Sequence, residues 1–185
     1  MGEQHKKHNR REHLNDFHLN VAGEYVYDGA LYACQSDDAK QHRIKRAVLG
    51  MAAIVIVAVA AGGCMPAPGM QNCLYVLLPY LCDFRGAGSV GWALVKLGTY
   101  WSAVREYNYQ KSVAVLPVRT AVTAVFSLLG IVCELIFFFV NDHAGQTFFA
   151  LLYVLLKLTA LLSALVLRAE IMQAEWDKLP KKNNS

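Results

Sequence analysis

Hydrophobic residues along this chain fall into four long blocks that are separated by short polar segments. The blocks cover about residues 47–63, 72–97, 120–140 and 147–167. Each is roughly as long as the ~20 residues that a helix needs to cross the ~30 Å hydrocarbon core of a bilayer. The pattern therefore predicts an all-α integral membrane protein with four transmembrane helices.

The composition agrees with a membrane protein and disagrees with an ordinary soluble domain. Of the 185 residues, 55% are hydrophobic and only 17% are charged, whereas charged residues make up about a quarter of a typical soluble domain. The first apolar block starts near Ala47, too far along the chain for a secretory signal peptide, so we expect it to be an anchor. The predicted organisation is a polar N-terminal segment (1–46), a four-helix membrane domain (47–168) and a C-terminal tail (169–185).

Lysine and arginine positions predict the orientation. They occur before the first block, between the second and third blocks, and after the fourth, whereas the connections 64–71 and 141–146 contain neither residue type. Short loops rich in Lys and Arg stay in the cytoplasm. We therefore expect a multi-pass protein of the inner or plasma membrane with both termini in the cytoplasm.

The N-terminal segment opens with a basic cluster of Lys6, Lys7, Arg10 and Arg11. Such a cluster can hold anionic lipid, each basic side chain adding about 1 kcal/mol near a charged surface. The alternatives are a solvated tail and a clamp for nucleic acid, and we expect no nucleic-acid partner. Several histidines lie nearby, but no Cys or carboxylate accompanies them at the spacing of a zinc site, so no metal is expected.

Two short aromatic runs lie within residues 21–34. Tyr25, Val26 and Tyr27 precede Asp28-Gly29, and Leu31 and Tyr32 follow it. Strand-forming residues on both sides of Asp-Gly are typical of a β-hairpin. The alternative is that these tyrosines lie at the level of the lipid headgroups.

Four charged residues lie well inside the apolar blocks, whereas Lys96 lies near the end of the second block. Asp83 and Arg85 lie in the second block, Glu134 in the third and Lys157 in the fourth. With a helical rise of about 1.5 Å per residue, all four fall at similar depth. Each unpaired charge would cost about 2.5–3.5 kcal/mol there, so we predict pairing of Glu134 with Lys157, and of Arg85 with Asp83 or Glu134.

This intramembrane polar cluster of Asp83, Arg85, Glu134 and Lys157 is the candidate site. It can be a binding site for a proton, an ion or a small anionic solute, with Glu134 or Asp83 as the titrating group. It can equally be an ion-pair network that fixes the register of the helices. Two acids and two bases balance each other, and this balance favours the network.

Two further patterns are candidate chemical motifs. Residues 86–91 match the dinucleotide-binding glycine pattern, but that pattern needs a preceding strand, and here the glycines lie inside an apolar block and indicate helix packing. Cys64 and Cys73 flank an extracytoplasmic turn and can form a disulfide. The closely spaced cysteine pair of disulfide-generating membrane enzymes is absent.

The sequence therefore favours a non-catalytic helper or subunit of a membrane complex. It contains no phosphate-binding loop, metalloprotease helix or nucleophile elbow, and we expect no cofactor. The alternative is an oligomeric transporter or channel for a proton, an ion or a small solute, and a thiol redox enzyme is a third hypothesis. The expected partners of this chain are the lipid bilayer and either another membrane protein or further copies of the chain.

Overall fold

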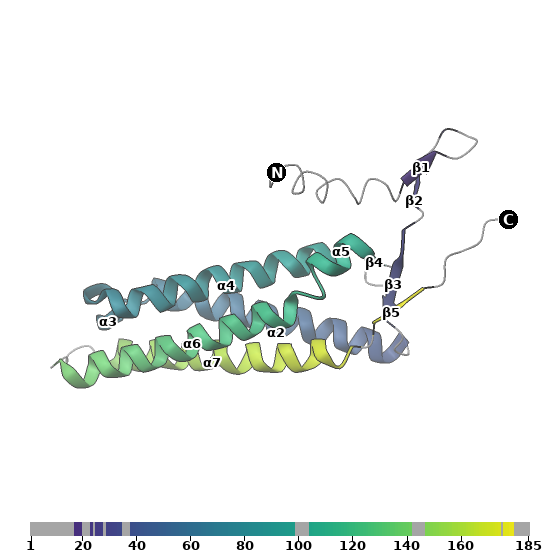
Figure 1. Ribbon diagram of the computed structural model, residues 1–185. Coiled ribbons are helices and arrows are strands. Elements are labelled where there is room, and N and C mark those ends of the chain that lie inside the picture. The colour runs from purple at the N-terminus through teal and green to yellow at the C-terminus, as the bar shows by residue number, and fades with distance from the viewer. Residues whose placement is uncertain are drawn as a thin grey trace, which may run out of the picture.

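The computed structural model describes residues 17–19, 23, 25–27, 29–34, 38–98, 104–141, 147–174 and 176–179. Its long helices lie side by side in an elongated bundle (Figure 1). They are α2 (Asp38–Cys64), α4 (Leu74–Gly98), α6 (Leu116–Val140) and α7 (Thr147–Met172). Each of the four predicted blocks coincides with one of these helices, although the helices extend beyond the apolar residues, most of all at the start of α2.

Three helical segments are long and apolar enough to cross a membrane. They are Ala39–Cys64, Glu106–Val140 and Thr147–Met172. Helix α4 has 25 residues and contains Asp83, Arg85 and Lys96, and it is not among these three segments. The structure thus supports three of the four predicted spans by length and composition, and a span at α4 remains a prediction.

The long helices are arranged so that each packs mainly on two others. Helix α7 packs extensively on α2 and on α6, and α6 packs extensively on α4. The contact between α2 and α4 closes the bundle and is the smallest of the four. The short helix α3 (Pro68–Asn72) follows α2 and contacts α4, α6 and α7.

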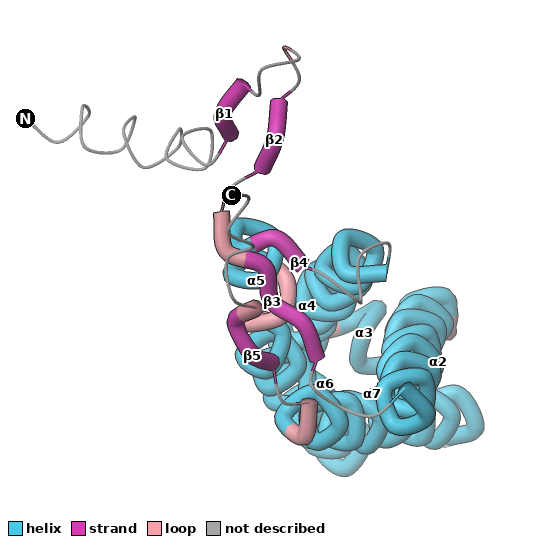
Figure 2. Tube along the Cα trace, turned by 90° about the vertical axis from the view of Figure 1, so that its right-hand side faces the viewer, coloured by secondary structure: helices cyan, strands magenta, loops and turns pink. Residues whose placement is uncertain are grey.

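A small antiparallel sheet lies at the opposite end of the bundle from α3 (Figures 1 and 2). Its central strand β3 (Leu31–Cys34) pairs with β4 (Val104–Arg105) and with β5 (Trp176–Lys178). Helix α5 (Glu106–Lys111) follows β4 directly. The sheet therefore joins three segments that are far apart in sequence: the one before α2, the one between α4 and α6, and the one after α7.

The predicted hairpin within residues 21–34 is wrong in its pairing. Residues 25–27 and 31–34 are strands, as predicted, but β2 (Tyr25–Tyr27) pairs with β1 (Phe17–Leu19). Gly23, in the connection between them, has φ +78°, a backbone conformation that glycine adopts readily. Strand β3 has β4 and β5 as its two neighbours, and Tyr32 on β3 stacks on Tyr109 of α5 with ring centroids 4.3 Å apart.

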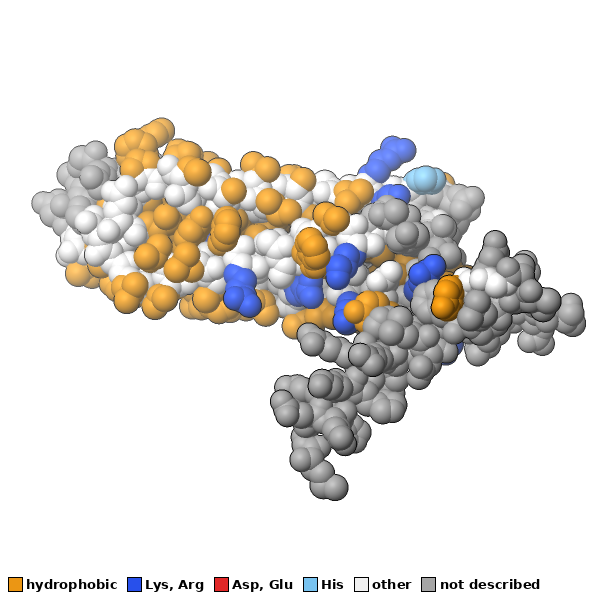
Figure 3. Space-filling model, turned by 90° about the horizontal axis from the view of Figure 1, so that it is seen from above, with side chains coloured by type: hydrophobic (Ala, Val, Ile, Leu, Met, Phe, Trp, Pro, Cys, Tyr) orange, Lys and Arg blue, Asp and Glu red, His pale blue; other side chains and the backbone are white. Residues whose placement is uncertain are grey.

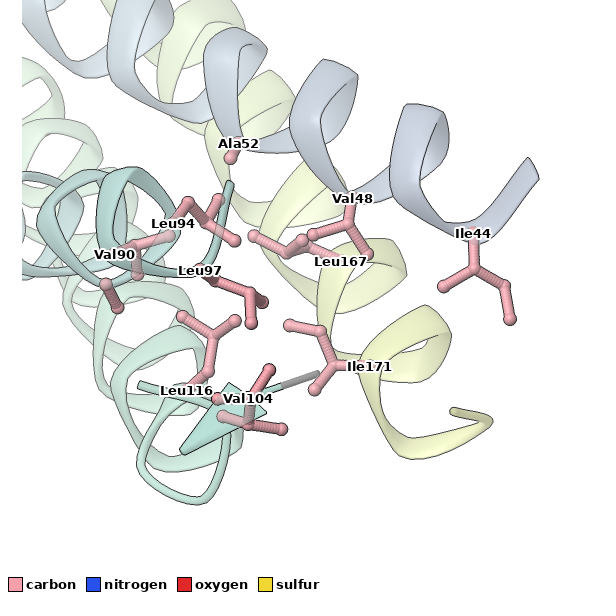
Figure 4. Close-up of a cluster of buried hydrophobic side chains, with 12 residues drawn as sticks. Ile44, Val48, Ala52, Val90, Leu94, Leu97, Val104, Leu116, Leu167 and Ile171 are labelled. Atoms are coloured by element: carbon pink, nitrogen blue, oxygen red, sulfur yellow. The ribbon is translucent and has the colours of Figure 1, made fainter. Parts of the chain in front are cut away.

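The main apolar core lies next to this sheet. Side chains from α2, α4, α6, α7 and β4 converge there (Figure 4), among them Ile44, Val48, Leu97, Val104, Leu116, Leu167 and Ile171. Further along the bundle, the buried apolar residues are mostly small: Val55, Ala58, Val59, Ala87, Ala124, Ala160 and Ala164. Small side chains let helix backbones approach closely, which is how helices pack in a membrane.

Candidate functional site

A buried ion pair connects α4 with α7. The Lys157 Nζ atom lies 2.5 Å from Asp83 Oδ2, and the two side chains are 1% and 0% exposed. The Ser127 hydroxyl on α6 donates a hydrogen bond to the same oxygen at 2.8 Å. One carboxylate oxygen therefore binds groups from two neighbouring helices.

Aromatic rings and glycine backbone surround the Lys157 ammonium group. Its Nζ atom lies 4.8 Å from the centroid of the Tyr80 ring and 5.6 Å from that of Tyr153. At these distances the ring faces attract a cation, most strongly where water is excluded. A Cβ atom at Gly130 would lie 3.5 Å from Lys157 Cε and 3.6 Å from the Tyr153 hydroxyl, so α6 runs close beside both groups.

Glu134 is also completely buried, on α6 and nearer to the α3 end of the bundle. Its Oε1 atom accepts a hydrogen bond from the Gly69 N–H of α3 at 3.3 Å. This N–H is in the first turn of α3, where backbone donors have no partner within the helix. A Cβ atom at Gly69 would clash with the Glu134 carboxylate, so this approach requires glycine.

Arg85 lies on the outside of the bundle. Its side chain is exposed, and it forms no ion pair with any residue that the structure describes. Helix α4 is continuous from Leu74 to Gly98, and residues two apart on a helix point about 200° from each other. Because Asp83 points into the bundle, Arg85 points out of it.

The structure places the four predicted charges but corrects their pairing. Asp83, Glu134 and Lys157 are buried among the helices, whereas Arg85 is not. The predicted Glu134–Lys157 pair is wrong, because the long Lys157 side chain reaches Asp83 instead. The predicted pairing of Arg85 with Asp83 or Glu134 is also wrong, since α4 keeps regular helical geometry and turns Arg85 outward.

Several residues of this polar centre were not predicted: Tyr80, Ser127 and Tyr153 around the ion pair, and Gly69 against Glu134. A signal for some of them was present in the spacing. Tyr153 precedes Lys157 by four residues and Tyr80 precedes Asp83 by three, and residues three or four apart lie on the same helix face. Nothing local in the sequence pointed to Gly69.

The glycines of residues 86–91 serve helix packing, as predicted, at two of three positions. A Cβ atom at Gly86 would lie 2.6 Å from Thr123 Oγ1 on α6, and one at Gly91 would lie 2.9 Å from Ile56 Cδ1 on α2. Gly88 is different, because its position is exposed and a Cβ there would meet nothing within 4 Å.

The remaining candidate residues are less informative. Cys64 is exposed and Cys73 half-buried, both as free thiols, and their disulfide stays a prediction. The basic cluster Lys6, Lys7, Arg10 and Arg11 lies outside the described residues. Within the described part of the chain, no three His, Cys, Asp or Glu side chains gather in a way that could hold a metal ion.

The chemistry available at the polar centre is that of a charged pair held away from solvent. Two buried atoms in it, Asp83 Oδ1 and the Tyr153 hydroxyl, have no hydrogen-bond partner among the described residues. Such atoms are uncommon in folded proteins, and they mark the part of the centre most open to a further polar contact.

No protein-family model, no curated protein and no solved structure matches this chain.

Proposed function

We propose that this chain is a non-catalytic subunit or helper of a membrane complex, with four transmembrane helices and both termini in the cytoplasm. The observation that carries the proposal is the direction of the charges in the apolar part of the bundle. Asp83, Glu134 and Lys157 point inward, where protein groups contact them. Of the four charges, Arg85 is the one that points outward, toward the surroundings of the bundle.

The inward charges fit a structural role. The ion pair, together with Ser127, joins α4, α6 and α7, and the Tyr80 and Tyr153 rings flank the ammonium group. Losing one partner of a buried pair typically costs about 3–5 kcal/mol, because the other charge stays behind without compensation. A pair of this kind therefore fixes which helix faces meet, and such a role needs no substrate.

The arrangement of the polar segments supports the proposed topology. All three strands of the β4-β3-β5 sheet come from segments that the Lys and Arg pattern assigns to the cytoplasm. They can form one sheet only if they lie on the same side of the membrane. This condition is met if an even number of spans separates the strands along the chain. Helices α2 and α4 lie between β3 and β4, and α6 and α7 lie between β4 and β5, so the condition favours a span at α4.

The proposal is tested by isolating the chain from its native membrane in a mild detergent. We expect a complex of fixed stoichiometry that contains at least one different membrane protein, measured by light scattering and by mass spectrometry of its subunits. A chain that is recovered only as a monomer, or only with copies of itself, would refute the subunit proposal.

A second candidate is movement of a proton or a small ion by an oligomer of this chain. It is favoured by Asp83 Oδ1 and the Tyr153 hydroxyl, which are buried beside the ion pair and have no hydrogen-bond partner within the described residues. Reconstitution into liposomes that contain a pH-sensitive dye separates the two candidates. A subunit leaves the dye signal unchanged, whereas a proton carrier gives a flux that Asp83→Asn reduces.

A further inference from the structure

Arg85 lies at the middle of the exposed face of α4. The exposed positions along this face include Leu78, Leu81, Arg85, Gly88, Trp92 and Val95. These six residues, here called the α4 stripe, alternate spacings of three and four, which is the spacing of a helix–helix seam. Any helix that faces lipid can show this spacing, so the informative features are the charge of Arg85 and the missing side chain of Gly88.

The position of Arg85 makes contact with water difficult if α4 spans a membrane. It is 11 residues from the first residue of α4 and 13 from the last, so about 16 Å and about 20 Å of helix separate it from the two ends. A long basic side chain can reach an interface only from near a helix end. By contrast, Lys96 is in the last turn of α4, with its Nζ atom 5.3 Å from the Trp92 ring centroid. Arg85 therefore needs a counter-charge within the membrane.

The part of the chain that the structure describes does not offer this counter-charge on the surface of the apolar part of the bundle. The described acidic side chains in the apolar part of the bundle are Asp83 and Glu134, and both are buried. Figure 3 shows Lys and Arg among hydrophobic side chains, and no acidic side chain is visible among the described residues in that view. A second copy of the chain docked through the same stripe would bring two Arg85 side chains together, which like-charge repulsion disfavours.

Gly88 provides space for a close neighbour. It follows Arg85 by three residues on the same face. Apart from its chain neighbours and the adjacent backbone of α4, no described atom lies within 4 Å of where its Cβ would be. Small residues allow another helix to approach the backbone, which increases van der Waals contact in lipid. A helix seated beside Gly88 would lie within reach of the Arg85 guanidinium.

We infer that the α4 stripe docks a transmembrane helix of a different protein, and that this helix carries an Asp or Glu at mid-membrane depth. The Arg85 guanidinium forms a charge-assisted, bidentate hydrogen-bonded pair with that carboxylate. The inference rests on the proposed function, since it names the chemistry of the partner that a subunit requires. It adds which face of the bundle the partner occupies.

Site-specific photocrosslinking in native membranes tests where the partner binds. A photoreactive amino acid replaces Leu81 or Trp92 in the stripe, and in matched controls it replaces Leu155 or Leu162, which are exposed on α7. We expect crosslinks from the stripe only, to an apolar segment of another protein that contains Asp or Glu. Crosslinks to lipid alone, to a second copy, or to a helix without a carboxylate would overturn the inference.

Charge substitutions test the pair itself. Arg85→Glu should reduce recovery of the complex at least tenfold. Arg85→Lys should retain more of it than Arg85→Glu, because the positive charge remains while the bidentate geometry is lost. Replacing the partner's acid with Arg should restore assembly with Arg85→Glu. If Arg85→Glu assembles normally, the inference is wrong. A heteromeric complex crosslinked only through α7 refutes this inference and leaves the subunit proposal intact, whereas absence of any heteromeric complex refutes the subunit proposal.

Discussion

Lys157 is the side chain whose removal should destabilise the bundle most, because Asp83 would stay buried without its counter-charge. Lys157→Met should lower the free energy of unfolding by about 3–5 kcal/mol. The double variant Asp83→Asn with Lys157→Met should recover part of this loss, since no charge then remains at the pair. Unfolding of the purified chain in detergent, followed by tryptophan fluorescence, measures both effects in a double-mutant cycle.

Arg85→Met is the matched control for Lys157→Met. It also replaces a long basic residue in the apolar part of the bundle, but its side chain is exposed. The isolated chain should change by less than about 0.5 kcal/mol, as is usual for surface substitutions. Equal losses for the Arg85 and Lys157 variants would contradict a structural role of the Asp83–Lys157 pair.

Gly69 and Gly88 form a second contrast at the level of single residues. Gly69→Ala introduces a Cβ that meets the Glu134 carboxylate, whereas Gly88→Ala introduces one into open space. We expect Gly69→Ala to cost about 1–3 kcal/mol, the usual range for overpacking. Gly88→Ala should leave the isolated chain as stable as before or slightly more stable, because alanine favours helix. Thermal unfolding of the two variants side by side checks this contrast.

The identity of the charged residues was predictable, and their partners were not. Asp83, Arg85, Glu134 and Lys157 are conspicuous because each interrupts an apolar block. Depth along a helix follows from counting residues, and depth alone brought Glu134 and Lys157 together. The direction in which a side chain points around the helix axis depends on how the neighbouring helices pack. In the packed bundle, the Lys157 side chain points toward Asp83 and pairs with it. As a result, the charges that are actually buried no longer balance, because Arg85 is outside.

The sheet that joins β3, β4 and β5 makes its own prediction at the level of the element. Tyr109 stacks on Tyr32 at 4.3 Å and lies 5.9 Å from the Trp176 ring, so one ring contacts both β3 and β5. Tyr109→Ala should increase amide hydrogen exchange in residues 31–34 and 176–178 and leave α6 and α7 protected. Hydrogen-exchange mass spectrometry measures each segment separately. Unchanged exchange in both strands would show that the aromatic contacts do not stabilise the sheet.

Elements that depend on local sequence were predicted better than elements that depend on distant segments. The apolar blocks identified α2, α4, α6 and α7, because a long apolar run is a local property. Residues 25–27 and 31–34 were identified as strands from their aromatic residues. Their pairing was wrong, since β4 comes from beyond α4 and β5 from beyond α7. The pairing of strands that lie so far apart in the sequence cannot be predicted from a short stretch of residues.

For the whole molecule, the orientation in the membrane can be measured, because the β4-β3-β5 sheet and α3 lie at opposite ends of the bundle. Cys64, at the end of α2, lies at the α3 end of the bundle, whereas Gln110 on α5 and Lys178 on β5 lie at the sheet end. All three positions are exposed. If both termini are cytoplasmic, a membrane-impermeant thiol reagent added from outside should label Cys64 and should not label cysteines introduced as Gln110→Cys or Lys178→Cys.

The same experiment decides between the remaining alternatives for orientation and for the cysteines. Permeabilised vesicles serve as the control, since all three positions should then react. Labelling of residues 110 and 178 from outside would show that the topology is the inverse of the proposed one. Labelling of only one of them would show that β5 and the segment of β4 and α5 lie on opposite sides of the membrane, which contradicts the sheet. If labelling of Cys64 requires prior reduction, and Cys73→Ser removes that requirement, the predicted disulfide between them exists. Labelling without reduction would show that the thiol at the α3 end is free, as it is in the structure.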